Sequence, residues 1–306
     1  MFVKKLFMMK KFIYLLPVLI FAFGCKSDKK EKKAEELTVY THRHYESDQE
    51  LFQLFEKQNN IKLNVVNASA DELIQKMSLE GEQSPADVLI TVDAGRLYRA
   101  KSKDLLQSFS SPLIDSIVPT HLRDEDQQWV SLTKRARVIA YSKDRVDSTE
   151  LSTYDDLTSD KWQDKILVRS SSNIYNQSLL ASIIANQGKE EAEQWAEGVL
   201  NNMARSPKGN DRDQVKAVAN NEGDLAIVNT YYLGKLLNSE DQSEVEAGQS
   251  VNIFFPNQQT TGAHINVSGI GVAKYSPNKE NAIKFIDFLL HEEGQKIFAG
   301  SNYDYP

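Results

Sequence analysis

Four tyrosines and one histidine follow three apolar segments of the sequence, 37–42, 165–172 and 224–229. In chain order they are His44, Tyr45, Tyr175, Tyr231 and Tyr232. Phenolate is a hard, anionic oxygen ligand, and the type of ligand follows the hardness of the metal. A free phenol has a pKa of about 10, but a bound cation favours the loss of its proton. Several phenolates with one neutral imidazole therefore indicate a site for a hard trivalent cation such as Fe³⁺.

Other uses of these side chains remain open at this point. Zinc prefers Cys and His, and calcium prefers carboxylates and carbonyls, so neither ion explains a tyrosine cluster. A single tyrosine is nevertheless far more often a half-buried packing residue than a ligand, and His44 alone fits a surface or helix-capping role. Aromatic side chains in a cleft also stack on an organic cation or a sugar. The metal interpretation therefore depends on the whole set lying together.

The first part of the folded chain alternates between strand and helix patterns. The expected order is strand, helix, strand, helix, strand, at residues 37–42, 47–60, 61–68, 69–81 and 86–93. Two helix starts carry a capping-box pattern, Ser47 with Glu50 and Ser69 with Glu72. This order predicts right-handed crossovers and a mainly parallel sheet with helices on both faces. Ligands of such α/β sheets bind beyond the carboxyl ends of the strands, where the tyrosines fall.

A second α/β set begins near residue 131. Its expected elements are two strands, two helices, two more strands and a final helix, at residues 131–143, 165–172, 176–203, 213–223, 224–229, 264–276 and 278–300. Two such sets and a late return segment predict two lobes joined by more than one crossing strand. We expect the first lobe to comprise residues 37–130 and 258–306 and the second lobe 131–257. About 270 folded residues suit this division.

The N-terminal sequence predicts an export signal. Residues 1–24 contain a basic segment and the apolar run "FIYLLPVLIFAF", which together are typical of a signal peptide. "AFGC" resembles a lipobox, so Cys25 is the predicted lipid-bearing first residue of the mature protein; a plain secretory signal or an uncleaved membrane anchor is the alternative. The charged residues that follow complete a predicted tether over 25–36. Because this cysteine is the only one, the sequence predicts no disulfide framework.

The charge of the chain excludes one class of partner. The formal net charge is −7, and it becomes −11 when the four lysines of residues 1–24 are removed. A strongly acidic chain is a poor candidate for binding nucleic acid. The charge is compatible with a cationic ligand.

Several sequence blocks resemble the periplasmic ferric-iron-binding proteins of ABC transporters. They are "SADELIQKMSLEGEQSPADVLITVDAGRLYRA", "KRARVIAYSKDRV", "STYDDL", "VRSSSNIYNQSLLASIIA" and "LAIVNTYYLGKL". The resemblance covers residues 37–305 and is closest to the branch with "RHY" after the first strand. It implies an α/β, two-lobed periplasmic-binding-protein fold of type II, similar to transferrin lobes, with ferric iron in the interlobe cleft.

The resemblance also implies a set of ligands. The iron-binding residues of the family fall on His44, Tyr45, Tyr175, Tyr231 and Tyr232. Family members differ in whether the histidine binds iron directly. Some members add carbonate or another synergistic anion held by an arginine. Arg135 stands at that position, Arg43 is a second candidate, and an ion pair at the lobe hinge is the alternative role for Arg135.

The function implied by the resemblance is capture and delivery without catalysis. We expect a periplasmic lipoprotein, anchored to a membrane and monomeric, that captures ferric iron and delivers it to an ABC permease and its ATPase. The alternative is a binding protein of the same fold for a polyamine, thiamine or phosphonate. The sequence has no Gly-rich phosphate loop, no "GxSxG" and no His-x-x-x-His pair, and its folded part has no thiol nucleophile, so we expect no enzyme.

Overall fold

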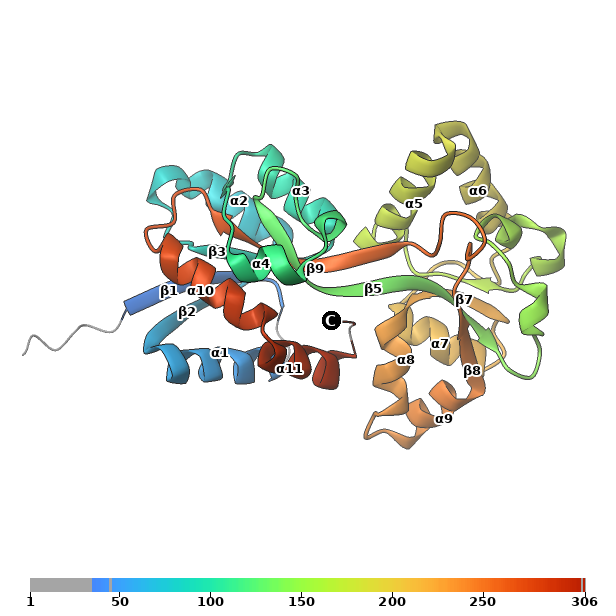
Figure 1. Cartoon of the computed structure of the whole chain (residues 1–306). Coiled ribbons are helices and arrows are strands. Elements are labelled where there is room, and N and C mark those ends of the chain that lie inside the picture. Colours follow the sequence, from blue (N-terminus) through green and yellow to red (C-terminus); the bar gives the residue numbers. More distant parts are fainter. Residues whose placement is uncertain (1–34, 44–45, 304, 306) are drawn as a thin grey trace, which may run out of the picture. The chain divides into compact units, whose positions relative to one another are not determined.

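The computed structural model of the protein describes residues 35–43, 46–303 and 305, and contacts within residues 34–306 define one compact unit (Figure 1). The predicted signal peptide, the lipid site Cys25 and most of the predicted tether lie outside the described residues. The first strand begins at Glu35, so the last two residues assigned to the tether already pair with a neighbouring strand. Among the described residues, no helix is both long and apolar enough to cross a membrane.

One part of the molecule is built on parallel strands followed by an antiparallel one. Its strands are β1 (Glu35–Thr41), β2 (Ile61–Asn67), β3 (Val88–Val92), β4 (Leu106–Gln107) and β9 (Ile265–Ala273). β1 pairs in parallel with β2 and β3, whereas β9 runs antiparallel to β3 and β4. The associated helices are α1 (Glu46–Asn59), α2 (Ala70–Glu80), α3 (Ala94–Ser102), α4 (Pro112–Ile117), α10 (Lys279–Leu290) and α11 (Glu292–Asn302).

Helices cover both faces of this sheet, which explains its apolar strands. Leu37 and Val39 of β1 pack in one core cluster with residues of α1, α4, α10 and α11. The alternate residue Tyr40 packs in another cluster with residues of α2 and α3. Because successive strand residues face opposite sides, a strand that is covered on both sides is buried along its length. β3 is buried at every position, as its uninterrupted apolar sequence predicts.

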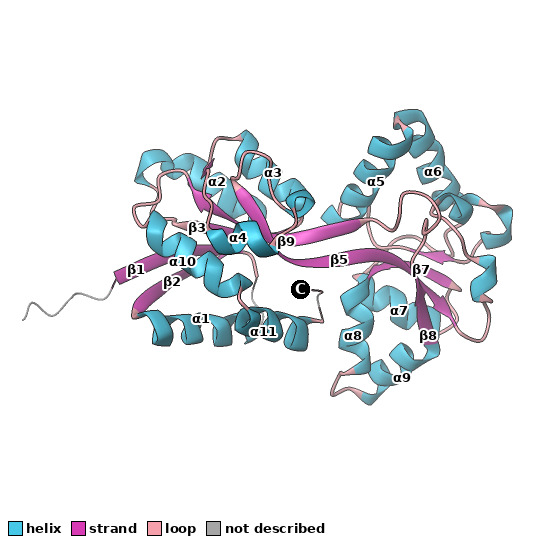
Figure 2. Ribbon diagram, in the orientation of Figure 1, coloured by secondary structure: helices cyan, strands magenta, loops and turns pink. Residues whose placement is uncertain are grey.

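The second part repeats this layering on a smaller sheet. Its strands are β5 (Trp129–Ser142), β6 (Ile166–Leu167), β7 (Leu225–Asn229) and β8 (Val251–Phe254). Residues of α5 (Ile174–Gln187) and α6 (Lys189–Asn201) pack in one core cluster with Ile139 and Ile227. The other cluster includes residues of α7 (Asp211–Ala219) and α8 (Thr230–Leu237). The helix α9 (Gln242–Ser250) packs beside these two helices, as Figures 1 and 2 show. Short 3₁₀ helices lie at Gly81–Gln83, Thr120–Leu122, Ser148–Glu150, Asp155–Thr158 and Asp160–Trp162.

Two long strands, β5 and β9, join the two parts, as Figure 2 shows. The first half of β5 pairs with β9, and its second half, from Arg137, pairs with β7 and β8. The strands follow the order β2-β1-β3-β9-β5-β7-β6. The sheet is therefore mixed rather than mainly parallel, because both crossing strands run antiparallel to their neighbours. The lobe boundary expected after residue 130 falls inside β5, and these boundaries stay a prediction.

Two helices that we predicted to be continuous are each broken into two. The predicted helix 176–203 is interrupted at Gly188, which separates α5 from α6 with φ at 104°, a conformation that favours glycine. The predicted helix 278–300 is interrupted at His291, whose backbone is extended (φ −68°, ψ 158°). Apolar periodicity continues across both breaks, so it did not reveal them.

One of the two predicted capping boxes is present. The Ser69 hydroxyl accepts a hydrogen bond from the Glu72 backbone, and the Glu72 carboxylate accepts one from the Ser69 backbone. The other prediction, at Ser47, is wrong because α1 already begins at Glu46 and Ser47 lies inside its first turn.

Candidate functional site

Tyr231 and Tyr232 lie side by side where β7 becomes α8. Asn229 ends the strand and is the N-cap of the helix. The ring centroids of the two tyrosines are 4.4 Å apart, and their planes are inclined by 31°. Tyr231 is buried and Tyr232 half-buried. The change from strand to helix thus brings adjacent phenols together, where a continuing strand would have pointed them to opposite faces.

Tyr175 meets this pair from the neighbouring strand-to-helix junction. It lies in the first turn of α5, where its backbone N–H donates to the side chain of the N-cap, Asn173, at 2.9 Å. The Tyr231 hydroxyl donates to the Tyr175 hydroxyl at 3.3 Å. The two junctions adjoin because β6 and β7 pair in parallel, so their carboxyl ends lie at one edge of the sheet. The tertiary fold therefore brings together three of the tyrosines singled out in the sequence.

Three cationic side chains lie against these phenol rings. The guanidinium carbons of Arg135 and Arg169 are 5.3 and 5.4 Å from the centroid of the Tyr175 ring. The Lys235 ammonium is 5.4 Å from the centroid of the Tyr231 ring. These distances are within the range of cation–π contacts. Sequence reasoning missed Arg169, although it stands in "VRSSS" just before the Tyr175 helix.

The surroundings of Tyr232 favour the protonated form of its phenol. Burial raises the pKa of Tyr232, and the charges of Asp211 and Tyr175 raise it further. A hydrogen bond with Tyr231 and the charge of Arg169 act in the opposite direction. A cation that bound here would have to displace this proton, so its affinity would depend on pH.

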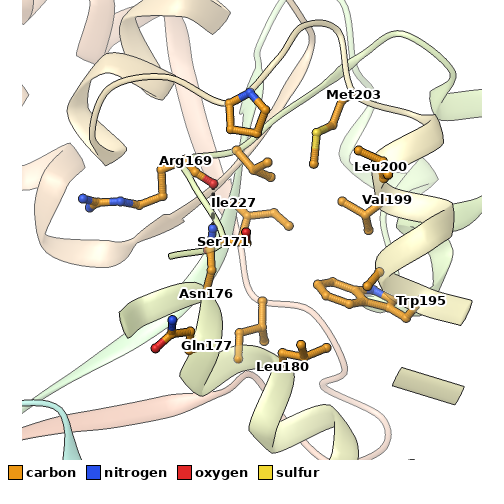
Figure 3. Close-up of a pocket in the computed structure, with 14 residues that line it drawn as sticks. Arg169, Ser171, Asn176, Gln177, Leu180, Trp195, Val199, Leu200, Met203 and Ile227 are labelled. Carbon is orange, nitrogen blue, oxygen red and sulfur yellow. Dashed lines mark hydrogen bonds between the residues drawn. The ribbon is translucent and has the colours of Figure 1, made fainter. Parts of the chain in front are cut away.

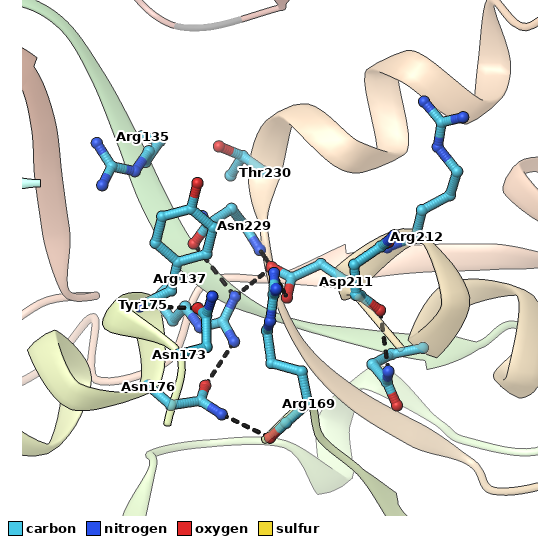
Figure 4. A network of polar contacts seen from close by, with 12 residues as sticks. Arg135, Arg137, Arg169, Asn173, Tyr175, Asn176, Asp211, Arg212, Asn229 and Thr230 are labelled. Atoms are coloured by element: carbon cyan, nitrogen blue, oxygen red, sulfur yellow. Dashed lines mark hydrogen bonds and ion pairs between the residues drawn. The ribbon is translucent and has the colours of Figure 1, made fainter. Parts of the chain in front are cut away.

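A buried ion-pair network connects the elements at these junctions, as Figure 4 shows. Asp211 is fully buried, forms an ion pair with Arg137 and another with Arg169 at 3.3 Å, and accepts the backbone N–H of Asn229 at 2.9 Å. Arg137 also donates to Asn176 on α5 at 2.7 Å. The network therefore ties β5, β7, α5 and α7 together beneath the tyrosines. Nothing in the local sequence around Asp211 indicates this role.

Asp93 forms a second polar centre, at the end of β3. It is fully buried and has φ at 85°, which costs a non-glycine residue about 1–3 kcal/mol. Its carboxylate accepts hydrogen bonds from Ser178 on α5 and from Asn266 on β9, each at 2.8 Å. Arg135 completes the group with an ion pair at 3.4 Å. Sequence reasoning missed this centre, because its members come from four separate segments of the chain.

The remaining predicted site residues have different placements. Arg135 is buried between Asp93 and the Tyr175 ring, so its geometry includes the hinge ion pair that we gave as the alternative role. Arg43 is also buried, with an ion pair to Asp48 at 3.0 Å and its guanidinium 4.9 Å from the Phe298 ring centroid. His44 and Tyr45 lie outside the described residues. Within the described part of the chain, no group of three or more His, Cys, Asp or Glu side chains is placed to hold a metal ion.

An apolar pocket lies between α5 and α6 (Figure 3), and Arg169 and Asn176 of the network contribute to its lining. Trp195, Leu180 and Val199 contribute to its wall, while the Arg169 guanidinium points away from them. None of the tyrosines discussed above lines it. Its lining suits apolar groups and offers no set of oxygen ligands for a cation.

Comparison with known proteins identifies relatives over most of the chain. Residues 83–306 match the family described as bacterial extracellular solute-binding protein. Iron uptake protein A1 of Synechocystis is 47% identical over 272 residues, which are 89% of this chain and 76% of that protein. The major ferric iron-binding protein of Neisseria meningitidis serogroup A is 27% identical over 89% of this chain and 80% of that protein.

Solved structures show the same fold. A Trichodesmium protein in complex with iron and citrate superposes with a TM-score of 0.85 at 48% identity, covering 89% of this chain and 86% of that one. The ferric binding protein from Campylobacter jejuni superposes with a TM-score of 0.84 at 47% identity, covering 88% and 86%. The two-lobed fold and the resemblance inferred from the sequence blocks are thereby confirmed. The chain belongs to the family of bacterial extracellular solute-binding proteins.

Proposed function

We propose that this protein captures ferric iron outside the cytoplasm and delivers it to an ABC permease with its ATPase. The observation that carries the proposal is the convergence of Tyr175, Tyr231 and Tyr232, with two phenol oxygens 3.3 Å apart. A cluster of phenols suits a hard trivalent cation better than zinc or calcium. The names of the relatives support the same cargo, since those proteins are described as iron-uptake or ferric iron-binding proteins.

The proposed ligands come from both lobes. The second lobe, residues 131–257, supplies the three clustered tyrosines, and the first lobe, residues 37–130 and 258–306, supplies His44 and Tyr45. Iron bound by one lobe would gain its remaining ligands when the hinge closes, so closure and affinity are coupled. Arg135 is the proposed holder of a synergistic anion such as carbonate, since it lies against the Tyr175 ring. Arg43 is a lesser candidate, because it lies against Phe298 instead. The citrate in the related Trichodesmium complex supports an anion beside the iron.

Location and release complete the proposal. The predicted signal peptide over 1–24, the predicted lipid site Cys25 and the predicted tether over 25–36 support a periplasmic location with a membrane anchor. We propose that the anchored protein is a monomer. Release follows either reduction, since Fe²⁺ is softer and less charged, or protonation of the phenols. The protein itself has no catalytic step.

A visible absorption titration of the full chain with ferric citrate tests the cargo. Phenolate bound to Fe³⁺ gives a charge-transfer band, so colour should appear and saturate at one equivalent. The double variant Tyr231→Phe, Tyr232→Phe should lose the colour. Tyr98→Phe is the matched control, since that tyrosine is 64% exposed on α3.

Two other outcomes would count against the proposal. A folded protein that gives no colour would rule out a ferric phenolate site in this chain. Binding of a polyamine, thiamine or phosphonate that survives the double substitution would favour the alternative solute class, because stacking does not need the hydroxyls.

A further inference from the structure

A hydrogen bond joins the end of β3 directly to a helix of the other lobe. The Ser178 hydroxyl on α5 donates to the carboxylate of Asp93 and lies 2.8 Å from both of its oxygens. Asp93 is fully buried and Ser178 is half-buried. These two residues are 85 positions apart in the chain, so only the approach of the two lobes brings them into contact.

Asp93 also contacts side chains of the two crossing strands, β5 and β9. Asn266 on β9 donates to its carboxylate at 2.8 Å, and Arg135 on β5 forms an ion pair with it at 3.4 Å. Asn266 and Arg135 are themselves partners in the register of β5 and β9. The carboxylate therefore contacts β5 and β9, the strands that a hinge motion would bend. It also contacts α5, the helix that would move in such a motion.

The backbone at Asp93 is adapted to this position. Its φ of 85° is rare for a residue with a side chain and persists only where surrounding contacts fix it. Its backbone N–H donates to Val267 at 2.8 Å, and its carboxylate accepts the N–H of Gly95 at 3.0 Å. A Cβ at residue 95 would lie 3.1 Å from that carboxylate, so the glycine leaves room for it.

The contact lies next to one described residue of the proposed iron site. Ser178 follows Tyr175 by three residues on α5, so the two side chains lie on the same face of the helix. β3 pairs in parallel with β1, where Ile90 is opposite Thr41, and the chain continues from Thr41 to His44 and Tyr45. The bond therefore links the helix that carries Tyr175 to the residue that follows β3.

We infer that Asp93 and Ser178 form a latch that stabilises the closed orientation of the two lobes. Both are positioning residues rather than ligands. Opening that moves α5 away from β3 would remove the hydroxyl from a buried carboxylate, so the bond favours closure. The consequence of the latch for iron affinity rests on the proposed function; the conformational effect does not.

The conformational effect is tested with spin labels on the full chain without iron. Cysteines replace the exposed residues Lys103 and Glu190, one in each lobe, in a Cys25→Ser background, and the distance distribution between the labels is measured by pulsed electron spin resonance. Ser178→Ala should shift the distribution to longer distances, and Ser178→Thr, which keeps a hydroxyl, should restore it.

A matched control lies one turn further along α5. Ser182→Ala makes the same chemical change at a half-buried residue whose hydroxyl has no hydrogen bond within the described part of the chain, so its distribution should match that of the wild type. Alanine favours helix at either position, so both variants should fold. An unchanged or shorter distribution in Ser178→Ala, or an equal shift in Ser182→Ala, would overturn the latch.

Iron release provides a second measurement. Loss of a hydrogen bond to a carboxylate should speed release of Fe³⁺ to excess chelator by about tenfold in Ser178→Ala, with little change in the association rate. An unchanged release rate would show that the latch does not control affinity. If the wild type binds no ferric iron, the proposed function fails, while the distance distributions still decide whether the latch exists.

Discussion

Tyr231 and Tyr232 form a pair because the strand ends immediately before them. A strand would have pointed the two rings to opposite faces, whereas the helix start at Thr230 leaves their centroids 4.4 Å apart. The sequence could predict the strand end from "LAIVN" and so the position of the pair. It could not predict the 3.3 Å contact with Tyr175, which depends on β6 pairing with β7.

Asp211 makes the largest number of the contacts described in the buried ion-pair network: it pairs with Arg137 and Arg169 and accepts the backbone N–H of Asn229. Asp211→Asn would leave the buried guanidinium of Arg137 without its carboxylate, and removing one partner of a buried ion pair costs about 3–5 kcal/mol. We expect urea unfolding to show a loss of this size. Asp115→Asn is the matched control: its carboxylate, 60% exposed, pairs with Arg123, and the change should cost less than about 1 kcal/mol. Equal losses in the two variants would contradict a supporting role for the network.

At the scale of elements, the structure breaks two helices that the sequence pattern predicted to be continuous. The break between α10 and α11 brings Gly294 against the carbonyl end of the preceding helix. A Cβ at this glycine would lie 2.7 Å from the oxygen of Phe288 and 2.8 Å from that of Leu289. Periodicity reports which face of a helix is apolar, and that face can continue through a change of direction.

Gly294→Ala tests the close approach of these two helices. Because backbone atoms must shift to admit the methyl group, we expect the free energy of unfolding to fall by about 1–3 kcal/mol. Gly300→Ala in the same helix meets nothing within 4 Å and should stabilise by up to about 1 kcal/mol through helix propensity. Chemical denaturation of both variants measures the difference. Stabilisation by both substitutions would show that α11 can move away from α10 at little cost.

The crossing strands place a histidine where its charged form is unfavourable. Burial lowers the pKa of His264 to about 4, with the charges of Arg135 and Arg137 acting in the same direction and that of Asp93 opposing them. Since the folded-state value lies below the ordinary one, the folded chain binds fewer protons here than the unfolded chain. The stability contributed by neutral His264 is therefore present above pH 6.5 and is lost as the pH falls towards 4.

Urea unfolding at pH 7.5 and pH 5.0 checks this sign. Between these two pH values the histidine should account for a loss of about 2 kcal/mol in the wild type. His264→Gln should lack that part of the loss, and the exposed His121→Gln should retain it. A wild type and His264→Gln with the same pH dependence would show that the histidine does not carry the effect.

At the scale of the whole molecule, β5 and β9 connect two sheets that each have helices on both faces. We propose that the iron ligands come from both lobes, so capture should stabilise the fold. A ligand that binds only the folded state at a hundredfold excess over its Kd adds about 2.7 kcal/mol. We expect ferric citrate to raise the Tm of the full chain by about 5 °C at pH 7.5.

Acid should reduce this stabilisation. Iron must displace protons from the phenols, and burial already raises the pKa of Tyr232, so the Tm shift should be smaller at pH 5.5 than at pH 7.5. Calorimetry with and without ferric citrate at the two pH values measures the change. The Tyr231→Phe, Tyr232→Phe variant should show no shift at either pH. An equal shift at both pH values would mean that phenols are not the ligands.

The sequence by itself determined the class of fold, most strands and helices, and the tyrosines at strand-to-helix junctions. Local signals were sufficient there: apolar runs such as that of β3, the Ser69–Glu72 capping box and distinctive blocks such as "NTYYLGKL". Only the tertiary structure decided that Tyr175 meets Tyr231, that Asp211 lies under them, and that Asp93 contacts Ser178. These contacts join residues distant in sequence, and the pairing of strands determines them. A local sequence pattern does not predict which strands pair. The pairing depends on which apolar faces bury one another in the folded chain.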